Sequence, residues 1–275
     1  MGRLLQSHPA VGVDALMEPI RQVHDLNGHY LNLAEQDRDK RVYRVLSVER
    51  LLEMLGTRHN ALVRPSKWDD PFENFLLRTV WSGQSGQPFT VGLRDQLYGQ
   101  CWSLLPESDA MWRIYSADKQ GVRITSTLSK LLASLWQAVT QVPELSCWIG
   151  KVTYHPRSQL KRMLEDGQGL ASLTVDPTGR AQASSLLIKR REFEHEKEVR
   201  LIFFSPQPRK EDVFRYAVNP VEIIEHIRFD PRLSTDVTAV FARHLRDEAG
   251  FKGKIDQSSL YRLPEQWLKM GKFPY

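Results

Sequence analysis

The chain has 275 residues, of which 41% are hydrophobic and 26% charged, a composition that excludes a disordered or membrane-embedded protein. Its formal net charge is +5, from 38 Lys and Arg against 33 Asp and Glu, which suits either a nucleic-acid or nucleotide ligand or a mildly basic surface with no such ligand. Two cysteines without disulfide or metal spacing, and no apolar run near the roughly 20 residues of a membrane span, predict a cytoplasmic protein with no membrane partner.

Residues 1–40 are predicted to form an N-terminal helical appendage, with Asp14 capping a helix that reaches Leu26. Residues 41–275 are predicted to form a single catalytic-type domain. Its expected strands cover residues 42–46, 99–105, 121–125, 149–155, 197–205, 213–219, 222–230 and 252–260. Its expected helices run from Ser47 to Gly56, over the first part of 108–125, and over 127–140, 184–194 and 235–250, with loops at 68–73 and 166–182. Because helices and strands mix without strict alternation, we expect an α+β fold with mixed, mainly antiparallel sheets and flanking helices.

Acidic residues alternate in the segment FEHEKEVR at 193–200, just before an apolar run. If the strand begins early, Glu194, Glu196, Glu198 and Arg200 share one face, because side chains two apart on a strand point the same way. One interpretation is a solvated ladder in which Arg200 pairs with Glu198. The other is a carboxylate held at the edge of a cleft, where it stabilises a developing positive charge.

The segment WDDPFE at 68–73 brings Asp69, Asp70 and Glu73 together around Pro71. Such a segment forms either a fixed turn with an Asx turn and a helix cap, or an oxygen-rich site for a hard cation. The carboxylates are too few for a calcium loop and no His or Cys assists them. We therefore expect a structural turn bordering a cleft.

Three further side chains have both a structural and a functional interpretation. Trp112 and Tyr115 share a helical face, which favours core packing but also suits stacking on a nicotinamide or a base. Arg44 lies within a short strand, where it either pairs with a buried carboxylate or anchors a phosphate or ribose.

Taken together, these stretches resemble a widespread, mostly bacterial and phage-borne domain family of unknown function. The resemblance covers residues 42 to 260 and is carried by Tyr43-Arg44, by Asp69-Asp70-Pro71-Phe72-Glu73, by Met111-Trp112-Arg113-Ile114-Tyr115-Ser116 with Gly121-Val122, and by Lys189 with Phe193, Glu196, Glu198 and Arg200. The sequence departs from the family pattern at three positions, where Asp69 replaces Asn, Phe193 replaces Trp and Ile114 replaces His.

The layout of the family is in turn similar to that of the ADP-ribosyltransferases, which implies an ADP-ribosyltransferase-like fold and NAD as substrate. In that plan Glu198 bonds the ribose 2′-hydroxyl and stabilises an oxocarbenium-like ribose, while Glu196 orients or deprotonates the acceptor. The implied NAD-binding residues are Tyr43, Arg44, Trp112 and Tyr115.

The resemblance implies an intracellular effector, a toxin or phage-defence protein, that modifies nucleic acid or protein and is controlled by an antitoxin or regulatory protein. Two other functions stay open at this point. One is a metal-dependent nuclease that uses Asp70, Glu73 and Glu198. The other is a non-catalytic module that binds a nucleotide or a partner, in which Arg200 holds Glu198 and makes it unavailable.

Overall fold

The computed structural model describes residues 26–269 and residue 271, with gaps at 84, 91, 140–145, 166–175, 177, 206 and 270. The helix expected from Asp14 therefore lies outside the described residues except for Leu26, as does most of the loop expected at 166–182. None of the helices within these described residues is long and apolar enough to cross a membrane.

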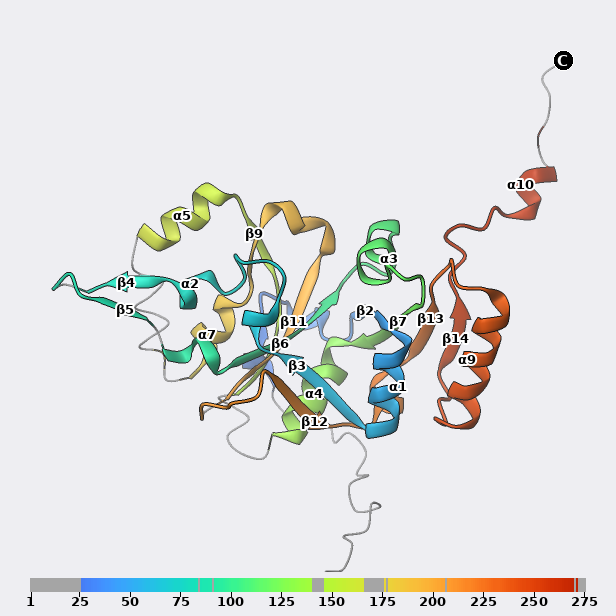
Figure 1. Cartoon of the computed structure of the whole chain (residues 1–275), viewed down its shortest axis with the longest axis horizontal. Helices are drawn as coiled ribbons and strands as arrows, with labels where there is room; N and C mark the ends of the chain where they lie inside the picture. Colours follow the sequence, from blue (N-terminus) through green and yellow to red (C-terminus); the bar gives the residue numbers. More distant parts are fainter. Residues whose placement is uncertain are drawn as a thin grey trace, which may run out of the picture.

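A 10-stranded sheet runs through the molecule (Figure 1). Its main path is β1-β8-β11-β6-β2-β7-β13-β14, and β3 pairs with both β6 and β12 beside this path. The pairs β1–β8 and β13–β14 are parallel and the remaining pairs of this sheet are antiparallel, which confirms the expected mixed, mainly antiparallel α+β fold. The strands of the sheet are β1 (Tyr30–Leu31), β2 (Arg41–Ser47), β3 (His59–Val63), β6 (Leu97–Ser103), β7 (Gly121–Thr127), β8 (Cys147–Lys151), β11 (Glu198–Phe204), β12 (Val213–Ala217), β13 (His226–Phe229) and β14 (Lys254–Gln257).

Helices flank the sheet, and two small sheets extend it. β4 (Val80–Ser82) and β5 (Pro88–Thr90) form a hairpin that projects from one end of the molecule, and β9 (Thr153–His155) pairs in parallel with β10 (Ile188–Arg190) (Figure 1). The described α-helices are α1 (Val48–Thr57), α2 (Phe75–Arg78), α3 (Asp109–Tyr115), α4 (Leu128–Ala138), α5 (Arg157–Glu165), α7 (Arg180–Ser185), α8 (Pro220–Ile223), α9 (Thr235–Asp247) and α10 (Glu265–Lys269). The described 3₁₀ turns are η2 (Asn27–His29), η3 (Glu35–Asp37), η4 (Pro65–Lys67), η5 (Gly92–Asp95) and η7 (Arg191–Glu196).

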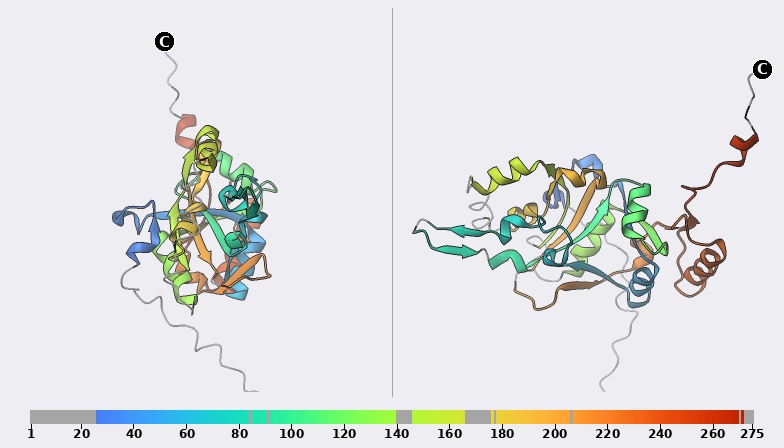
Figure 2. Two further views of the ribbon diagram at one scale, coloured as in Figure 1. Left: turned by 90° about the vertical axis from the view of Figure 1, so that its left-hand side faces the viewer. Right: turned by 45° about the horizontal axis from the view of Figure 1, so that its top comes forward.

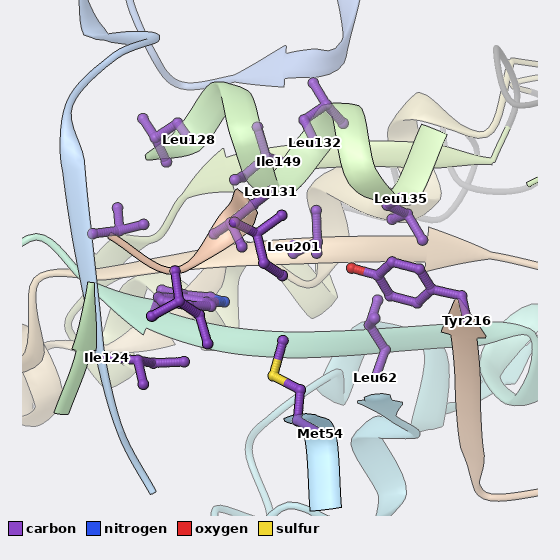
Figure 3. Close-up of a cluster of buried hydrophobic side chains, with 14 of the residues drawn as sticks. Met54, Leu62, Ile124, Leu128, Leu131, Leu132, Leu135, Ile149, Leu201 and Tyr216 are labelled. Atoms are coloured by element: carbon purple, nitrogen blue, oxygen red, sulfur yellow. The ribbon is translucent and has the colours of Figure 1, made fainter. Parts of the chain in front are cut away.

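The two faces of the sheet carry separate hydrophobic cores. The larger core packs α1, α4, α8 and α9 on one face, and Figure 3 shows leucines of α4 turned toward the strands beneath, one of which carries Leu201. The smaller core lies against the other face and includes Leu76 and Leu77 of α2 with Trp148 and Ile202 of the sheet. Since strand residues alternate between faces, β11 contributes Leu201 to one core and Ile202 to the other.

The sheet forks at β6. β2 pairs with β6 only at Tyr43 opposite Ser103, whereas β3 pairs with β6 only at Val63 opposite Gly99. Between these two points neither neighbour pairs with β6 on that edge, although β11 pairs with its whole length on the other edge. The fork leaves room within the sheet itself, at the middle of β6.

Most of the predicted elements are present, whereas β3, β4, β5, α2 and α5 were not predicted. Local interactions explain where two of the helices begin. Ser47 and Ser108 cap α1 and α3 by accepting hydrogen bonds from backbone N–H groups three residues ahead. Helix α1 does not stop at Gly56, however, but ends at Thr57. The next residue, Arg58, terminates it by adopting the left-handed conformation with φ 54°.

Three predicted elements were wrong in extent or type. The helix expected at 184–194 is instead the end of α7, strand β10 and the start of η7, because β10 pairs with β9 and this tertiary pairing overrides the local pattern. The strand expected at 222–230 begins late, since Pro220 starts the short helix α8 first. The strand expected at 149–155 divides between β8 and β9, which belong to different sheets.

The described part of the predicted appendage, residues 26–40, contains η2, η3 and β1. Tyr30 and Leu31 extend the sheet by pairing with Ile149 and Gly150. The boundary expected at residue 41 stays a prediction. At the other end of the chain, α10 projects away from the body of the molecule in all three views (Figures 1 and 2).

Candidate active site in the fork of the sheet

A cavity of about 170 Å³ occupies the fork. β2 and β6 form two of its walls, and α3, the end of η7 and the start of β11 supply the others. The cavity is lined by Tyr43, Arg44, Val45, Gly99, Gln100, Cys101, Trp102, Ser103, Met111, Tyr115, Glu196 and Glu198. Five of the six residues singled out from the sequence therefore line one cavity, although they lie up to 155 positions apart, from 43 to 198.

Arg44 forms one wall of this cavity. It pairs with Ile124 of β7, so its side chain starts on the face of the sheet that carries the larger core. Glu198 starts on the other face, as Ile202 does, so the two residues line one cavity only because the sheet is open at the fork. Burial lowers the pKa of Arg44, and no carboxylate among the described residues is close enough to oppose that effect. The pair with a buried carboxylate that the sequence left open for Arg44 is thus absent from the described part of the chain. A half-buried arginine without a carboxylate partner is a ready binding group for an anionic ligand.

Glu198 lies on the other wall and is 3% exposed. Its Oε1 accepts a hydrogen bond from Arg200 Nε at 2.8 Å, and its Oε2 accepts hydrogen bonds from Arg200 Nη2 and Lys189 Nζ, each at 3.0 Å. Burial raises the pKa of Glu198, but the two cations outweigh burial and lower this pKa to about 2. The Cys101 thiol, on the neighbouring strand, donates a further hydrogen bond to the carboxylate. Glu198 is therefore an anion at neutral pH.

Glu196 is held beside Glu198 by Lys189. The Glu196 carboxylate accepts hydrogen bonds from Lys189 Nζ at 2.6 Å and from the Tyr115 hydroxyl at 3.2 Å. Burial and the nearby Glu196 raise the pKa of Tyr115, so its hydroxyl stays protonated and remains a donor. Burial disfavours the Lys189 cation, but the surrounding carboxylates Glu198, Glu73 and Glu196 raise its pKa overall. One buried lysine thus holds both glutamates at the cavity.

Glu196 and Glu198 both line the cavity, but not because they share a face of one strand, as the sequence predicted. Residues 191–196 form the 3₁₀ helix η7 rather than a strand, and Lys197 follows in the left-handed conformation with φ 45°. β11 begins only at Glu198, so Glu194 does not share a strand face with it; the Glu194 side chain is 49% exposed and lies near Lys197. The four-residue alternation was therefore wrong as a strand, although Glu196 and Glu198 converge and Arg200 does pair with Glu198.

The WDDPFE loop supports this acidic wall. Glu73 lies 2.6 Å from Arg200 Nη2 and 3.3 Å from Lys189 Nζ, and burial raises its pKa. Asp70 accepts hydrogen bonds from Arg190 and from the Phe72 backbone, as an Asx turn does. These contacts agree with the expected structural turn, which lies behind the cavity wall and does not itself line the cavity.

Trp112 and Ile114 of α3 lie outside the cavity. Trp112 is 1% exposed, its indole N–H donates to Glu107 Oε1 at 2.8 Å, and it lines a separate cavity of about 10 Å³. It fixes α3 to the body, so we omit it from the proposed NAD-binding residues. Ile114, where the resembling family has His, is 54% exposed and is absent from the cavity wall, so this replacement does not change the cavity lining.

Sequence reasoning missed several residues of the site. Lys189 and Met111 had a signal in the family motifs but no assigned role, whereas Cys101 and Gln100 carried none that distinguishes them from core residues. Within the described residues no group of three His, Cys, Asp or Glu side chains is arranged to hold a metal ion. Glu73, Glu196 and Glu198 gather around Lys189 and Arg200 instead, so these carboxylates are paired with two buried cations.

A family model described as a protein of unknown function (DUF2971) matches residues 111–201, less than half of the chain. The matched segment includes Met111, Tyr115, Glu196 and Glu198 of the cavity wall. The resemblance to a family of unknown function is thus supported for this segment. No curated protein matches the sequence.

Among solved structures, the chain is similar to DarT of Thermus sp. 2.9. The complex with NAD+ is 13% identical with a TM-score of 0.36, and the match covers 80% of this chain and 96% of that one. The complex with carba-NAD+ is 15% identical with a TM-score of 0.34, and covers the same shares. The complex with ADP-ribosylated ssDNA is 13% identical with a TM-score of 0.36, and covers 94% of that chain.

Proposed function

We propose that this chain is an NAD-dependent ADP-ribosyltransferase-like enzyme with its active site in the fork of the sheet. One observation carries the proposal: Arg44, which has no carboxylate partner among the described residues, lines the same cavity as the ionised Glu198. NAD needs both groups, because its diphosphate is anionic and its ribose becomes cationic as nicotinamide leaves.

The size of the cavity limits which part of NAD enters it. A cavity of roughly 150 Å³ is enough for a benzene-sized ring, whereas whole ligands of drug size occupy about 300–1,000 Å³. At about 170 Å³ this cavity takes the nicotinamide end, with the ring beside Tyr43 and Tyr115. The diphosphate reaches Arg44 at the wall, and the adenosine end lies outside the cavity.

In the proposed reaction the bond between ribose C1′ and the nicotinamide nitrogen breaks, and nicotinamide leaves with the electron pair. Glu198 accepts a hydrogen bond from the ribose 2′-hydroxyl and stabilises the positive charge that develops on the ribose. An acceptor nucleophile then attacks C1′, and Glu196 receives its proton. The basic Arg200 and Lys189 keep Glu198 charged for this role.

Glu198 has one replaceable partner. A carboxylate has about four acceptor positions, and three of those on Glu198 are filled by N–H donors of Arg200 and Lys189. The fourth is filled by the Cys101 thiol, a weak donor that also lines the cavity. The ribose hydroxyl would displace this thiol and leave the ion pairs intact.

A second candidate function is a non-catalytic nucleotide- or partner-binding module. It is favoured by the burial of Glu198 and by its bonds to Arg200 and Lys189, which occupy both carboxylate oxygens. This module would bind NAD or another nucleotide at Arg44 without cleaving it. We do not favour the nuclease, because Glu73 and Glu198 are paired with buried cations and Asp70 with Arg190.

The acceptor we propose is a nucleic acid or a protein, in line with the net charge of +5. We further propose that the protein acts in the cytoplasm as a toxin or phage-defence effector and is restrained by an antitoxin or regulatory protein. Growth arrest on expression of the wild type, relieved by Glu198→Gln, would support the effector role. Unimpaired growth with the wild type would contradict it.

The decisive experiment incubates the purified chain with labelled NAD and candidate acceptors. We expect the wild type to release nicotinamide and to transfer label. Glu198→Gln should lower the rate by about 100-fold or more, because it removes a group that stabilises the transition state. Arg44→Met should raise KM for NAD. Ile114→Ala is the matched control on α3 and should leave both parameters unchanged. Binding of NAD without nicotinamide release would instead favour the binding module.

A further inference from the structure

Trp68 begins the WDDPFE loop and lies against Arg200. The centre of the Arg200 guanidinium is 4.5 Å from the centroid of the Trp68 ring, the arrangement of a cation–π contact. Arg200 is 0% exposed, so no water shares that face of the guanidinium. The ring therefore covers one flat side of this buried cation.

Each of the three nitrogen atoms of the Arg200 guanidinium has a polar partner. Nε and Nη2 donate to the two oxygens of Glu198, Nη1 donates to the Leu186 carbonyl at 2.5 Å, and Nη2 also lies 2.6 Å from Glu73 Oε2. A guanidinium is planar, so a rotation of its plane would break the paired contact with Glu198. The ring of Trp68 opposes that rotation from the flat side, where no hydrogen bond can.

Gly99 makes room for the Trp68 ring. A Cβ atom at Gly99 would lie 2.7 Å and 2.8 Å from two carbon atoms of the indole, closer than carbon atoms approach each other. Gly99 lies on β6 opposite Ile202, two residues before Cys101, which lies opposite Arg200. The absence of a side chain at this strand position thus lets an aromatic ring lie on the sheet beside Arg200.

We infer that Trp68 and Gly99 together position Arg200, so that its guanidinium holds the Glu198 carboxylate charged and directed into the cavity. Trp68 is a positioning residue in this assignment, since it acts on Glu198 through Arg200. The functional consequence rests on the proposed role of Glu198. The contact itself and its effect on the Glu198 carboxylate do not depend on that role.

A simpler explanation is that Trp68 only fills the smaller core and that Glu73 and the Leu186 carbonyl suffice to hold Arg200. The two explanations predict different pKa values for Glu198 after Trp68 is replaced. If Trp68 positions Arg200, a loosened guanidinium stabilises the Glu198 carboxylate less, and the pKa of Glu198 rises. If Trp68 is only a core residue, its replacement lowers stability and leaves the pKa of Glu198 unchanged.

The test compares Trp68→Leu, Trp68→Phe and Gly99→Ala with Trp81→Leu. Trp68→Leu removes the ring face, Trp68→Phe keeps one, and Gly99→Ala displaces the native ring. Trp81 belongs to the same core and is not in the cavity wall, so Trp81→Leu controls for lost packing. The titration of Glu198 is followed by carbon NMR of the glutamate carboxyl groups, with its signal assigned from Glu198→Gln.

We expect the pKa of Glu198 to rise by about one unit in Trp68→Leu and Gly99→Ala, and to stay near the wild-type value in Trp68→Phe and Trp81→Leu. An unchanged pKa in Gly99→Ala, or equal shifts in Trp68→Leu and Trp81→Leu, would overturn the assignment. If Trp68→Leu does not fold, the pKa of Glu198 is compared between Gly99→Ala and Trp68→Phe, and a higher pKa in Gly99→Ala supports the assignment.

Activity supplies a second readout. In an active enzyme, Trp68→Leu and Gly99→Ala should lower kcat more than they raise KM and should move the acid limb of the pH profile upward, while Trp68→Phe restores both. If the wild type releases no nicotinamide, the proposed function fails, but the carboxyl titration still decides the role of Trp68.

Discussion

At the residue scale, the acidic wall of the cavity depends on the balance between burial and pairing. Three carboxylates, Glu73, Glu196 and Glu198, share two cations, Lys189 and Arg200. Burial alone would neutralise such groups, and it does raise the pKa of Glu73, whereas the bidentate arginine keeps Glu198 charged. Neighbouring carboxylates with opposite pKa shifts are a common property of sites that handle protons.

Cys101 permits a test of the acceptor position on Glu198. Cys101→Ala should free this position and lower KM for NAD, whereas Cys101→Ser places a stronger donor there and should raise KM. The two substitutions change volume little, so opposite effects on KM would identify the hydrogen bond as the cause. Steady-state kinetics or NAD titration measures the effect, and a shift in the same direction for both variants would contradict it.

The pKa of Glu198 also predicts a pH dependence of stability. This pKa is about 2 in the folded protein against an ordinary value of 4.5, so ionised Glu198 stabilises the fold above pH 4.5, and this contribution disappears as the pH falls toward 2. The free energy of unfolding of the wild type relative to Glu198→Gln should stay constant from about pH 5 to 8 and decrease below that range. Denaturant titrations at several pH values measure this difference, which a pH-independent result would contradict.

At the scale of elements, the site depends on how α3 is held. Arg232 follows β13 and donates to the Trp112 and Ser116 carbonyls at the end of α3, at 3.0 and 2.7 Å. Asp230 accepts a hydrogen bond from the Ser116 hydroxyl at 2.6 Å and pairs with Arg232. These contacts tie the end of α3 to the segment that follows β13, and they fix Tyr115 at the cavity.

Arg232→Met should therefore loosen α3 without unfolding the sheet. Hydrogen bonds to a charged group contribute about 1.5–3 kcal/mol, so amide hydrogen exchange over residues 109–116 should accelerate by roughly tenfold or more. Arg113→Met, which removes an exposed ion pair within the same helix, is the control and should change exchange by about twofold or less. Equal exchange rates in the two variants would show that Arg232 does not hold the helix.

At the scale of the whole molecule, the parts that were predicted from sequence are those that local chemistry determines. Ser47 and Ser108 cap their helices, and β2, β6, β7 and β11 follow apolar alternation or apolar runs. The convergence of Arg44 and Glu198 was predicted only through a family resemblance, since no local pattern relates the two positions. The roles of Lys189, Trp68 and Gly99 were not predicted, because each depends on partners that tertiary folding supplies.

The fork in the sheet has a consequence for biosynthesis. Its walls include β2 (Arg41–Ser47) and β11 (Glu198–Phe204), and β6 lies between them and pairs with both. At about 5–20 residues per second, a ribosome needs on the order of ten seconds to proceed from one wall to the other. A nascent or truncated chain that lacks β11 has neither Glu198 nor Arg200. If the proposed reaction consumes NAD, it can therefore begin only after synthesis has passed this strand.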